Sequence, residues 1–82
     1  MEEIYVVRVL VRILDDNFEI NSYNAIVTKD YEKALGVFNK EIAEASDEYG
    51  QFTIEESNKE KFASNINEEG NGQEISLECW EV

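Results

Sequence analysis

The clearest hydrophobic pattern in the chain lies between Asp30 and Gly50. Apolar residues recur there at steps of one, three and four, the spacing of one stripe along a 3.6-residue helix. Asp30 is a good N-cap because its carboxylate accepts from free amides of the first turn, and Gly50 stands where a left-handed residue would end the helix. We therefore predict a helix whose buried stripe consists of Tyr31, Ala34, Leu35, Phe38, Ile42, Ala45 and Tyr49.

Residues 3–14 follow a period of two, which is typical of a β-strand. One face of this strand is wholly apolar and is the expected core face, formed by Tyr5, Val7, Val9, Val11 and Ile13. The other face mixes Ile4, Val6, Leu10 and Leu14 with Arg8 and Arg12. An almost unbroken apolar run of this kind indicates a strand in the middle of a sheet.

A hairpin is expected next, because the turn-forming sequence Asp15-Asp16-Asn17 separates this strand from a second one over residues 18–29. The second strand has a polar middle, Asn21 to Asn24, whose register the pattern does not fix and where a β-bulge would fit. After the helix, residues 51–56 alternate again and predict a third strand, with Phe52 and Ile54 facing inward.

Residues 57–67 fit two structures equally well. Phe62 and Ile66 are four apart, which suits a short helix capped by Ser57 or Asn58, but the segment also suits a short strand. Residues 67–73 contain two glycines and two asparagines and predict a loop. Residues 74–82 predict the last strand, with Ile75, Leu77 and Cys79 on the core face.

The predicted fold is therefore α+β, a single domain of 82 residues. We expect an antiparallel sheet of about four strands with one main helix on one face, in the order ββαββ or ββαβαβ. The other sheet face would stay uncovered, with Val6, Leu10 and Trp80 as apolar anchors for a possible homodimer. If the first and last strands are neighbours, Arg8 and Arg12 can pair with Glu74 and Glu78.

Charge is the strongest compositional signal, since seven basic and nineteen acidic residues give a net charge of -12. Twelve of the acids and only two of the bases lie in residues 41–82. Direct binding of DNA or RNA needs the opposite sign, whereas a basic protein would be attracted over a long range. The start MEEIYVV lacks the basic residues of a signal peptide, so a cytoplasmic location is expected.

The predicted helix ends against the usual charge rules. It carries four acids and no base after Lys40, although acids at a helix C-terminus oppose the dipole. Such a departure is a candidate for function. With the acids that follow, the expected partner-binding residues are Glu41, Glu44, Asp47, Glu48, Glu55, Glu56, Glu68 and Glu69. Gly36, inside the helix, is expected where helix and sheet approach closely.

The sequence offers little for catalysis. It has no histidine and one cysteine, Cys79, which we expect to be a small buried hydrophobic residue. Histidine-based catalysis and a good zinc site are therefore excluded, and we predict neither an enzyme nor a cofactor. One calcium-loop coincidence exists, but its first position lacks a charge and a strand follows it instead of a helix: Asn67, Glu69, Asn71, Gly72 and Glu78. We predict no metal site.

In size, charge and the layout of one helix on a sheet, the chain resembles small acidic proteins of phages and other mobile elements, including anti-CRISPR and DNA-mimic inhibitors. Residues 53–57 and 75–78 also look like uncharacterised proteins of gut bacteria and their phages. The resemblance implies a protein that works by binding, with carboxylates in place of phosphates, and that blocks a nuclease or defence protein. A small homodimeric structural or regulatory module is the alternative.

Overall fold

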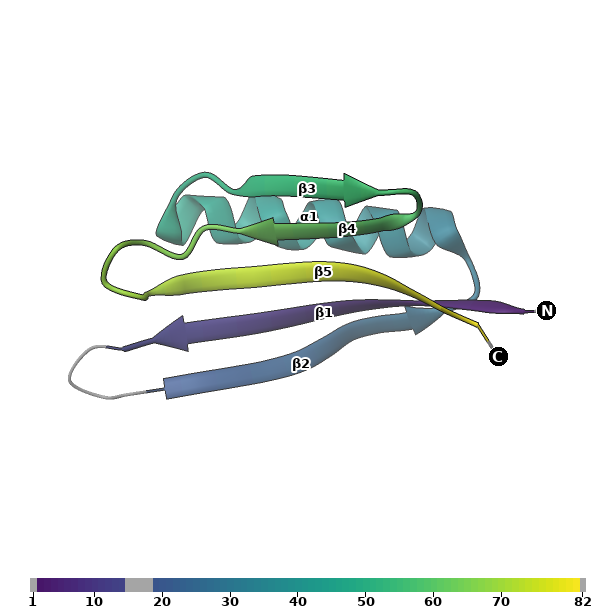
Figure 1. Cartoon of the computed structure of the whole chain (residues 1–82), viewed down its shortest axis with the longest axis horizontal. Helices are drawn as coiled ribbons and strands as arrows, with labels where there is room; N and C mark the ends of the chain where they lie inside the picture. Colours follow the sequence, from purple (N-terminus) through teal and green to yellow (C-terminus); the bar gives the residue numbers. More distant parts are fainter. Residues whose placement is uncertain (1, 15–18, 82) are drawn as a thin grey trace.

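One helix packs on one face of a five-stranded antiparallel sheet (Figure 1). The computed structural model describes the backbone of residues 2–14 and 19–81 and the side chains of these residues other than 19 and 47–49. The elements follow the order ββαβββ: β1 (Glu3–Ile13), β2 (Glu19–Thr28), α1 (Tyr31–Tyr49), β3 (Thr53–Ser57), β4 (Glu60–Ser64) and β5 (Gly72–Glu81).

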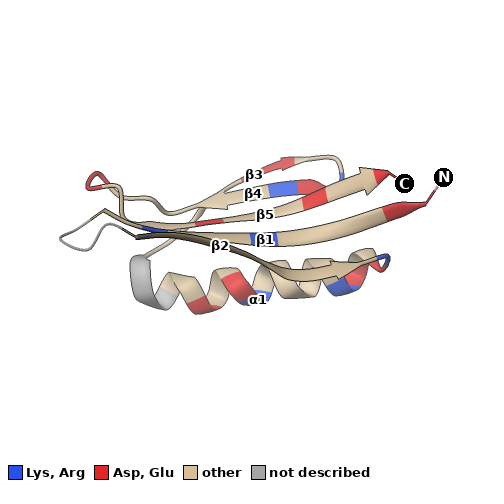
Figure 2. Cartoon of the chain, turned by 90° about the horizontal axis from the view of Figure 1, so that it is seen from below, with Lys and Arg blue, Asp and Glu red and all other residues tan. Residues whose placement is uncertain are grey.

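The strands lie in the order β2-β1-β5-β4-β3, so β1 is an interior strand paired on both edges, as predicted, although β5 is the middle one. Edge-on, the molecule has two layers, with α1 on one side of the sheet (Figure 2). The α+β class and the antiparallel sheet are confirmed, but the prediction of about four strands was wrong. Within the described ranges, no helix combines the length and hydrophobicity that a membrane crossing needs.

The fifth strand comes from the segment that the sequence left undecided. Residues 57–67 hold no helix: β3 and β4 form a hairpin around Asn58 and Lys59. Asn58 adopts a positive φ of 57°, which asparagine tolerates better than most residues. Ala63 of β4 pairs with Ile75 and is fully buried, while Phe62 points to the other face. The alternation of a strand therefore overrides the helical spacing of Phe62 and Ile66.

The helix begins and ends as predicted. A carboxylate oxygen of Asp30 accepts hydrogen bonds from the amides of Glu32 and Lys33, at 3.0 and 3.3 Å. Gly50 follows the last turn with φ 107°. Among the described side chains the buried stripe differs slightly from the expected one, because Val37 packs against the core while Leu35 does not belong to it. The predicted stripe residue Tyr49 lies outside the described side chains.

The helix contacts β5, β1 and β2, and the core beneath it is formed by α1, β1, β5 and Ala63 of β4, with Ala25 and Ile26 of β2 packed against it. The core consists of Tyr5, Val7, Val9, Ala34, Phe38, Ala45, Ala63, Ile75 and Leu77. Because the helix packs against β5, β1 and β2, it does not cover β3. Ile54, which was expected to face inward into the core, is 48% exposed.

Two further expectations about the backbone can be compared with the structure. The β-bulge lies at Ala25, just after the predicted polar stretch, because Val7 pairs with Ile26 but Arg8 pairs with Asn24. Gly36 is exposed, with nothing within 4 Å of the place where a β-carbon would stand. A close helix–sheet approach is therefore not the reason for this glycine. The predicted turn Asp15-Asp16-Asn17 lies outside the described residues.

Candidate protein-binding surface

The sheet face opposite α1 is a broad, uncovered surface, which we call the open face. Its apolar side chains come from four strands: Ile4, Val6 and Leu10 of β1, Ile20 and Val27 of β2, Phe62 of β4, and Trp80 of β5. The most exposed are Val27 at 58%, Trp80 at 54%, Ile20 at 50% and Phe62 at 40%. Single exposed apolar side chains are common, but several large ones on one sheet face indicate a binding surface, so the open face is the candidate surface among the described residues.

Of the three predicted dimer anchors, only Trp80 is strongly exposed. Val6 is 9% exposed, and Leu10 is half-buried. Ile20, Val27 and Phe62 were missed by the sequence reasoning. The register of the first hairpin decides which residues of β2 share a face with Trp80, and the alternative structures for residues 57–67 hid Phe62.

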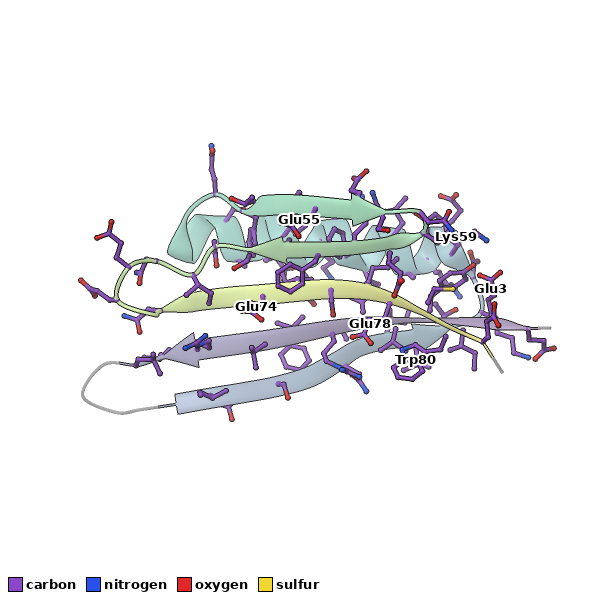
Figure 3. The ribbon with its side chains drawn as sticks, in the orientation of Figure 1. Glu3, Glu55, Lys59, Glu74, Glu78 and Trp80 are labelled. Carbon is purple, nitrogen blue, oxygen red and sulfur yellow. The ribbon has the colours of Figure 1, made fainter. Side chains whose placement is uncertain are left out.

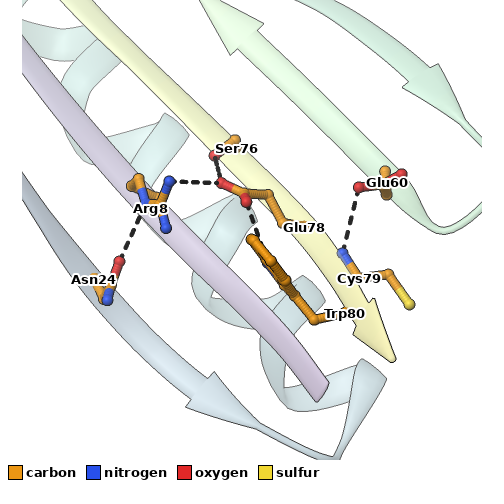
Figure 4. Close-up of polar contacts among 7 residues, drawn as sticks. All are labelled: Arg8, Asn24, Glu60, Ser76, Glu78, Cys79 and Trp80. Atoms are coloured by element: carbon orange, nitrogen blue, oxygen red, sulfur yellow. Dashed lines mark hydrogen bonds and ion pairs between the residues drawn. The ribbon is translucent and has the colours of Figure 1, made fainter. Parts of the chain in front are cut away.

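A polar network fixes the centre of the open face (Figure 4). The carboxylate of Glu78 accepts hydrogen bonds from the Ser76 hydroxyl at 3.1 Å and from the Trp80 indole N–H at 3.2 Å. It also forms an ion pair with Arg8 at 3.3 Å. Arg8 in turn donates to the side-chain oxygen of Asn24 at 3.3 Å. The network connects β2, β1 and β5 and holds the exposed indole in one orientation.

The predicted arginine–glutamate pairing is confirmed only for Arg8. The first and last strands are indeed neighbours, but Arg8 lies opposite Ser76, so its ion pair with Glu78 is diagonal. Arg12 lies opposite Gly72. Among the residues that the structure describes, Arg12 forms no ion pair with Glu74.

A depression of about 380 Å³ lies on the open face beside Phe62. Its lining includes four glutamates, Glu55, Glu56, Glu60 and Glu78, and one lysine, Lys61, which is paired with Glu56. Glu55 and Glu78 come from β3 and β5, the two strands that flank β4 (Figure 3). An aromatic ring surrounded by carboxylates offers both cation–π and charge attraction to a basic side chain.

The acids predicted to bind a partner do not lie on one surface. Glu41 and Glu44 lie on α1 beside Tyr23, where burial and then these two carboxylates raise the pKa of Tyr23. Glu68 and Glu69 lie in the β4–β5 loop, which Asn67 shapes by accepting from the amides of Glu69 and Asn71. The side chains of Asp47 and Glu48 are outside the described set.

The remaining two predicted acids occupy β3, an outer strand of five exposed residues. Glu55 lies on the open face opposite Phe62, whereas Glu56 is on the helix side and forms an ion pair with Lys61. Charges on a short outer strand discourage pairing with other chains. Of the six predicted acids whose side chains are described, strand alternation places Glu55 on the open face, and Glu56 also borders the depression.

A second polar cluster, at the end of the sheet where both termini lie, was not predicted (Figure 3). One carboxylate oxygen of Glu3 accepts from the Tyr5 hydroxyl and from the Cys79 thiol, each at 3.0 Å. The ammonium group of Lys59 lies 3.6 Å from this oxygen and donates to the Tyr5 hydroxyl at 3.3 Å. Lys59 comes from the β3–β4 turn, so only the fold brings it to Glu3.

This cluster changes the acidity of its members. The hydrogen bonds from Cys79 and Tyr5, with the positive charge of Lys59, lower the pKa of Glu3. The bond to Glu3, together with burial, raises the pKa of Cys79, so the thiol is less nucleophilic than an ordinary one. Cys79 packs against the core, which agrees with its predicted position on the core face, but it is half-buried and hydrogen-bonded to Glu3, so the expectation of a buried hydrophobic residue was only partly right.

The calcium-loop coincidence has no structural counterpart. The side-chain oxygen of Asn67 is already bonded to two amides of its own loop. Glu78 lies six residues along an extended strand from Gly72, a span of about 20 Å. These residues therefore do not converge on one ion.

Compared with protein-family models, curated proteins and solved structures, the chain matches none of them. Arguments about its function therefore start from the open face and its surroundings.

Proposed function

We propose that this protein is a non-enzymatic inhibitor that binds a basic protein through its open face. The observation that carries this proposal is that four large apolar side chains are exposed on one sheet face of a small acidic domain: Ile20, Val27, Phe62 and Trp80. An exposed apolar patch with polar surroundings is typical of a protein-binding site. The fixed indole of Trp80 suits an anchor, because little further ordering is needed on binding.

The depression beside Phe62 supports a basic partner. A lysine or arginine side chain entering it would contact the aromatic ring and meet the carboxylates of Glu55, Glu60 and Glu78. The net charge of -12 would also raise the association rate with such a partner. We place the partner among nucleic-acid-binding proteins, such as a nuclease or defence protein, whose basic grooves normally receive phosphates.

The acids away from the open face have a different role in this proposal. Glu41, Glu44, Glu68 and Glu69 contribute to the long-range field and not to the central contact. Their individual removal would slow association slightly, since rim charges mainly affect the association rate. Phe62 and Trp80 would contribute most to the lifetime of the complex.

The test compares the wild-type protein with two lysine variants as immobilised baits in an extract of the native host. Phe62→Lys places a positive charge in the acidic depression. Ile54→Lys is the matched control, because Ile54 is exposed to a similar degree on the neighbouring outer strand but faces the other side of the sheet. We expect proteins that elute with salt from the wild-type and Ile54→Lys baits and that are lost from the Phe62→Lys bait.

A captured protein must then lose nucleic-acid binding when the wild-type inhibitor is added. This competition separates inhibition from simple adhesion to an acidic surface. If Phe62→Lys retains the same proteins as the wild type, the open face is not the binding site. If the captured proteins bind nucleic acid equally well with the inhibitor present, mimicry of phosphates is wrong.

A homodimer through the open face is the second candidate. It is favoured by the placement of charge, because Arg8 and Arg12 lie on β1 while Glu55, Glu74 and Glu78 lie on β3 and β5. A two-fold axis could place the arginines of one copy over the glutamates of the other. Sedimentation equilibrium tests this: the wild type would form a dimer that Trp80→Ala weakens, and a wild-type monomer at millimolar concentration would exclude it.

A further inference from the structure

The outer strand β2 presents a free edge for pairing with another chain. In the described residues β2 pairs only with β1, so alternate backbone N–H and C=O groups point away from the sheet (Figure 1). Such an edge is a template for a further strand unless the sequence protects it. Charged residues, proline and short length are common forms of protection.

The two outer strands differ sharply in this protection. β3 has five residues, two of which are Glu55 and Glu56. β2 has ten residues, and the nine from Ile20 to Thr28 include no charged residue and no proline. This is the longest uncharged run in a chain that is 32% charged. Seen from the β2 side, the body of the strand is free of acidic and basic residues (Figure 2). Its protection within the described residues is the bulge at Ala25.

The charges at the two ends of β2 identify the partner strand. The uncharged run starts after Glu19 and stops before Lys29, so its ends carry opposite signs. Antiparallel pairing of two identical strands brings the Glu19 end of each to the Lys29 end of the other. Lys29 is bonded to Glu2 at 3.0 Å, but both side chains are 68% exposed, and such a pair exchanges readily.

We propose that β2 pairs antiparallel with β2 of a second copy of this chain. Two copies with a net charge of -12 repel each other over most of their surfaces. At this edge the facing residues are neutral and the end charges attract, so β2 is where the repulsion is smallest. The result is one continuous ten-stranded sheet with a two-fold axis perpendicular to it, in the isologous arrangement typical of dimers.

This geometry has a consequence for the open face. An axis perpendicular to the sheet keeps both open faces on the same side and both helices on the other. The dimer would thus present two copies of the surface around Trp80 to a single partner or to a repeated one. The edge proposal does not depend on the proposed function, because it rests on β2 and not on Phe62 or Trp80.

The main experiment measures dimerisation by sedimentation equilibrium up to millimolar concentration. Ser22→Lys with Asn24→Lys places charges in the middle of the edge, because residue 24 of one copy lies opposite residue 24 of the other when Glu19 pairs with Lys29. Gln51→Lys with Thr53→Lys is the control with the same net charge, at exposed positions in and just before β3, the outer strand at the opposite edge of the sheet. We expect a wild-type dimer, a dissociation constant raised about tenfold or more in the β2 variant, and little change in the control.

Reversal of the end charges tests the antiparallel direction. Lys29→Glu alone should weaken the dimer, and the double change Glu19→Lys with Lys29→Glu should restore it. Carbodiimide treatment of a mixture of isotopically light and heavy wild-type protein should join Glu19 of one copy to Lys29 of the other. This cross-link needs no variant, so it tests the proposal even if a substitution disturbs folding.

A wild-type monomer at millimolar concentration would overturn the proposal, as would a dimer that the β2 variant leaves intact. A dimer that is insensitive to the β2 variant but weakened by Trp80→Ala would assign self-association to the open face. A β2 dimer whose baits capture no basic protein would leave the edge proposal standing while the proposed function fails.

Discussion

The indole N–H of Trp80 donates a hydrogen bond of 3.2 Å to the carboxylate of Glu78, two residues earlier on the same face of β5. The same carboxylate holds Arg8 of β1 and the hydroxyl of Ser76. One glutamate therefore fixes the position of the largest exposed side chain on the open face. Trp80 is also the only tryptophan of the chain, so its fluorescence reports this relationship directly.

Glu78→Ala should release the indole of Trp80 and shift its emission to longer wavelength, because the ring becomes mobile in water. The variant should also lose about 1–2 kcal/mol of unfolding free energy, since three donors lose their shared acceptor. Urea unfolding and fluorescence spectra measure both effects. Glu74→Ala, on the same strand and face, is the control and should leave the emission unchanged.

The cluster around Glu3 predicts a slow reaction of Cys79 with alkylating reagents. The hydrogen bond to Glu3 raises the pKa of the thiol above its ordinary value of 9.0, and the thiolate is the reactive form. Glu3→Gln removes the negative charge, so alkylation at mildly alkaline pH should become several-fold faster. Glu81→Gln changes another carboxylate beside Cys79 and should react at the wild-type rate. Equal rates in Glu3→Gln and wild type would contradict the assignment.

The same cluster predicts how stability changes with pH. Its hydrogen bonds and Lys59 lower the pKa of Glu3 in the folded protein below the ordinary value of 4.5. This contribution to stability is therefore present above pH 4.5 and is lost as the pH falls through the lower folded pKa. Glu3→Gln should be less stable than the wild type at neutral pH, and the difference should shrink in acid. Parallel pH curves in urea unfolding would show that Glu3 is not the cause.

Gly36 and Gly72 should respond oppositely to alanine. Gly36 is an exposed helical residue with free space around it, so Gly36→Ala should raise the unfolding free energy by about 0.8–1 kcal/mol. The melting temperature should rise by roughly 4–8 °C for each kcal/mol.

Gly72 has φ 149°, and a β-carbon there would lie 2.7 Å from the backbone oxygen of Asn65. Gly72→Ala should therefore destabilise the protein by more than about 1 kcal/mol. Thermal unfolding of both variants checks the pair.

Local patterns were sufficient for much of the fold. The stripe from Tyr31 to Ala45 and the cap at Asp30 define α1, because helix periodicity and capping act within a few residues. The alternation from Tyr5 to Val9 defines the buried face of β1 for the same reason. The β3–β4 hairpin was harder to predict, because its turn has Asn58-Lys59 in place of the usual asparagine–glycine pair.

The candidate surface was predicted less well than the fold. Trp80 and Leu10 belong to the open face as expected, but Val27 joins them only through the register that the bulge at Ala25 sets. The doublet Glu55 and Glu56 divides between the two faces of β3, as alternation requires. Lys59 and Glu3 meet because a turn and a strand distant in sequence are folded together, and no local pattern encodes that contact.

The position of β1 between β2 and β5 also has a consequence for the folding pathway. Its pairing with β2 is local and can form early, whereas its pairing with β5 joins residues as remote as Val7 and Leu77. Non-local pairing of this kind slows folding, because the long intervening loop must be closed first. Until β5 docks, the apolar strand β1 has one unpaired edge, and the hairpin is open to intermolecular pairing. We therefore expect aggregation during refolding to depend strongly on protein concentration, with the docking of β5 as the step that ends it.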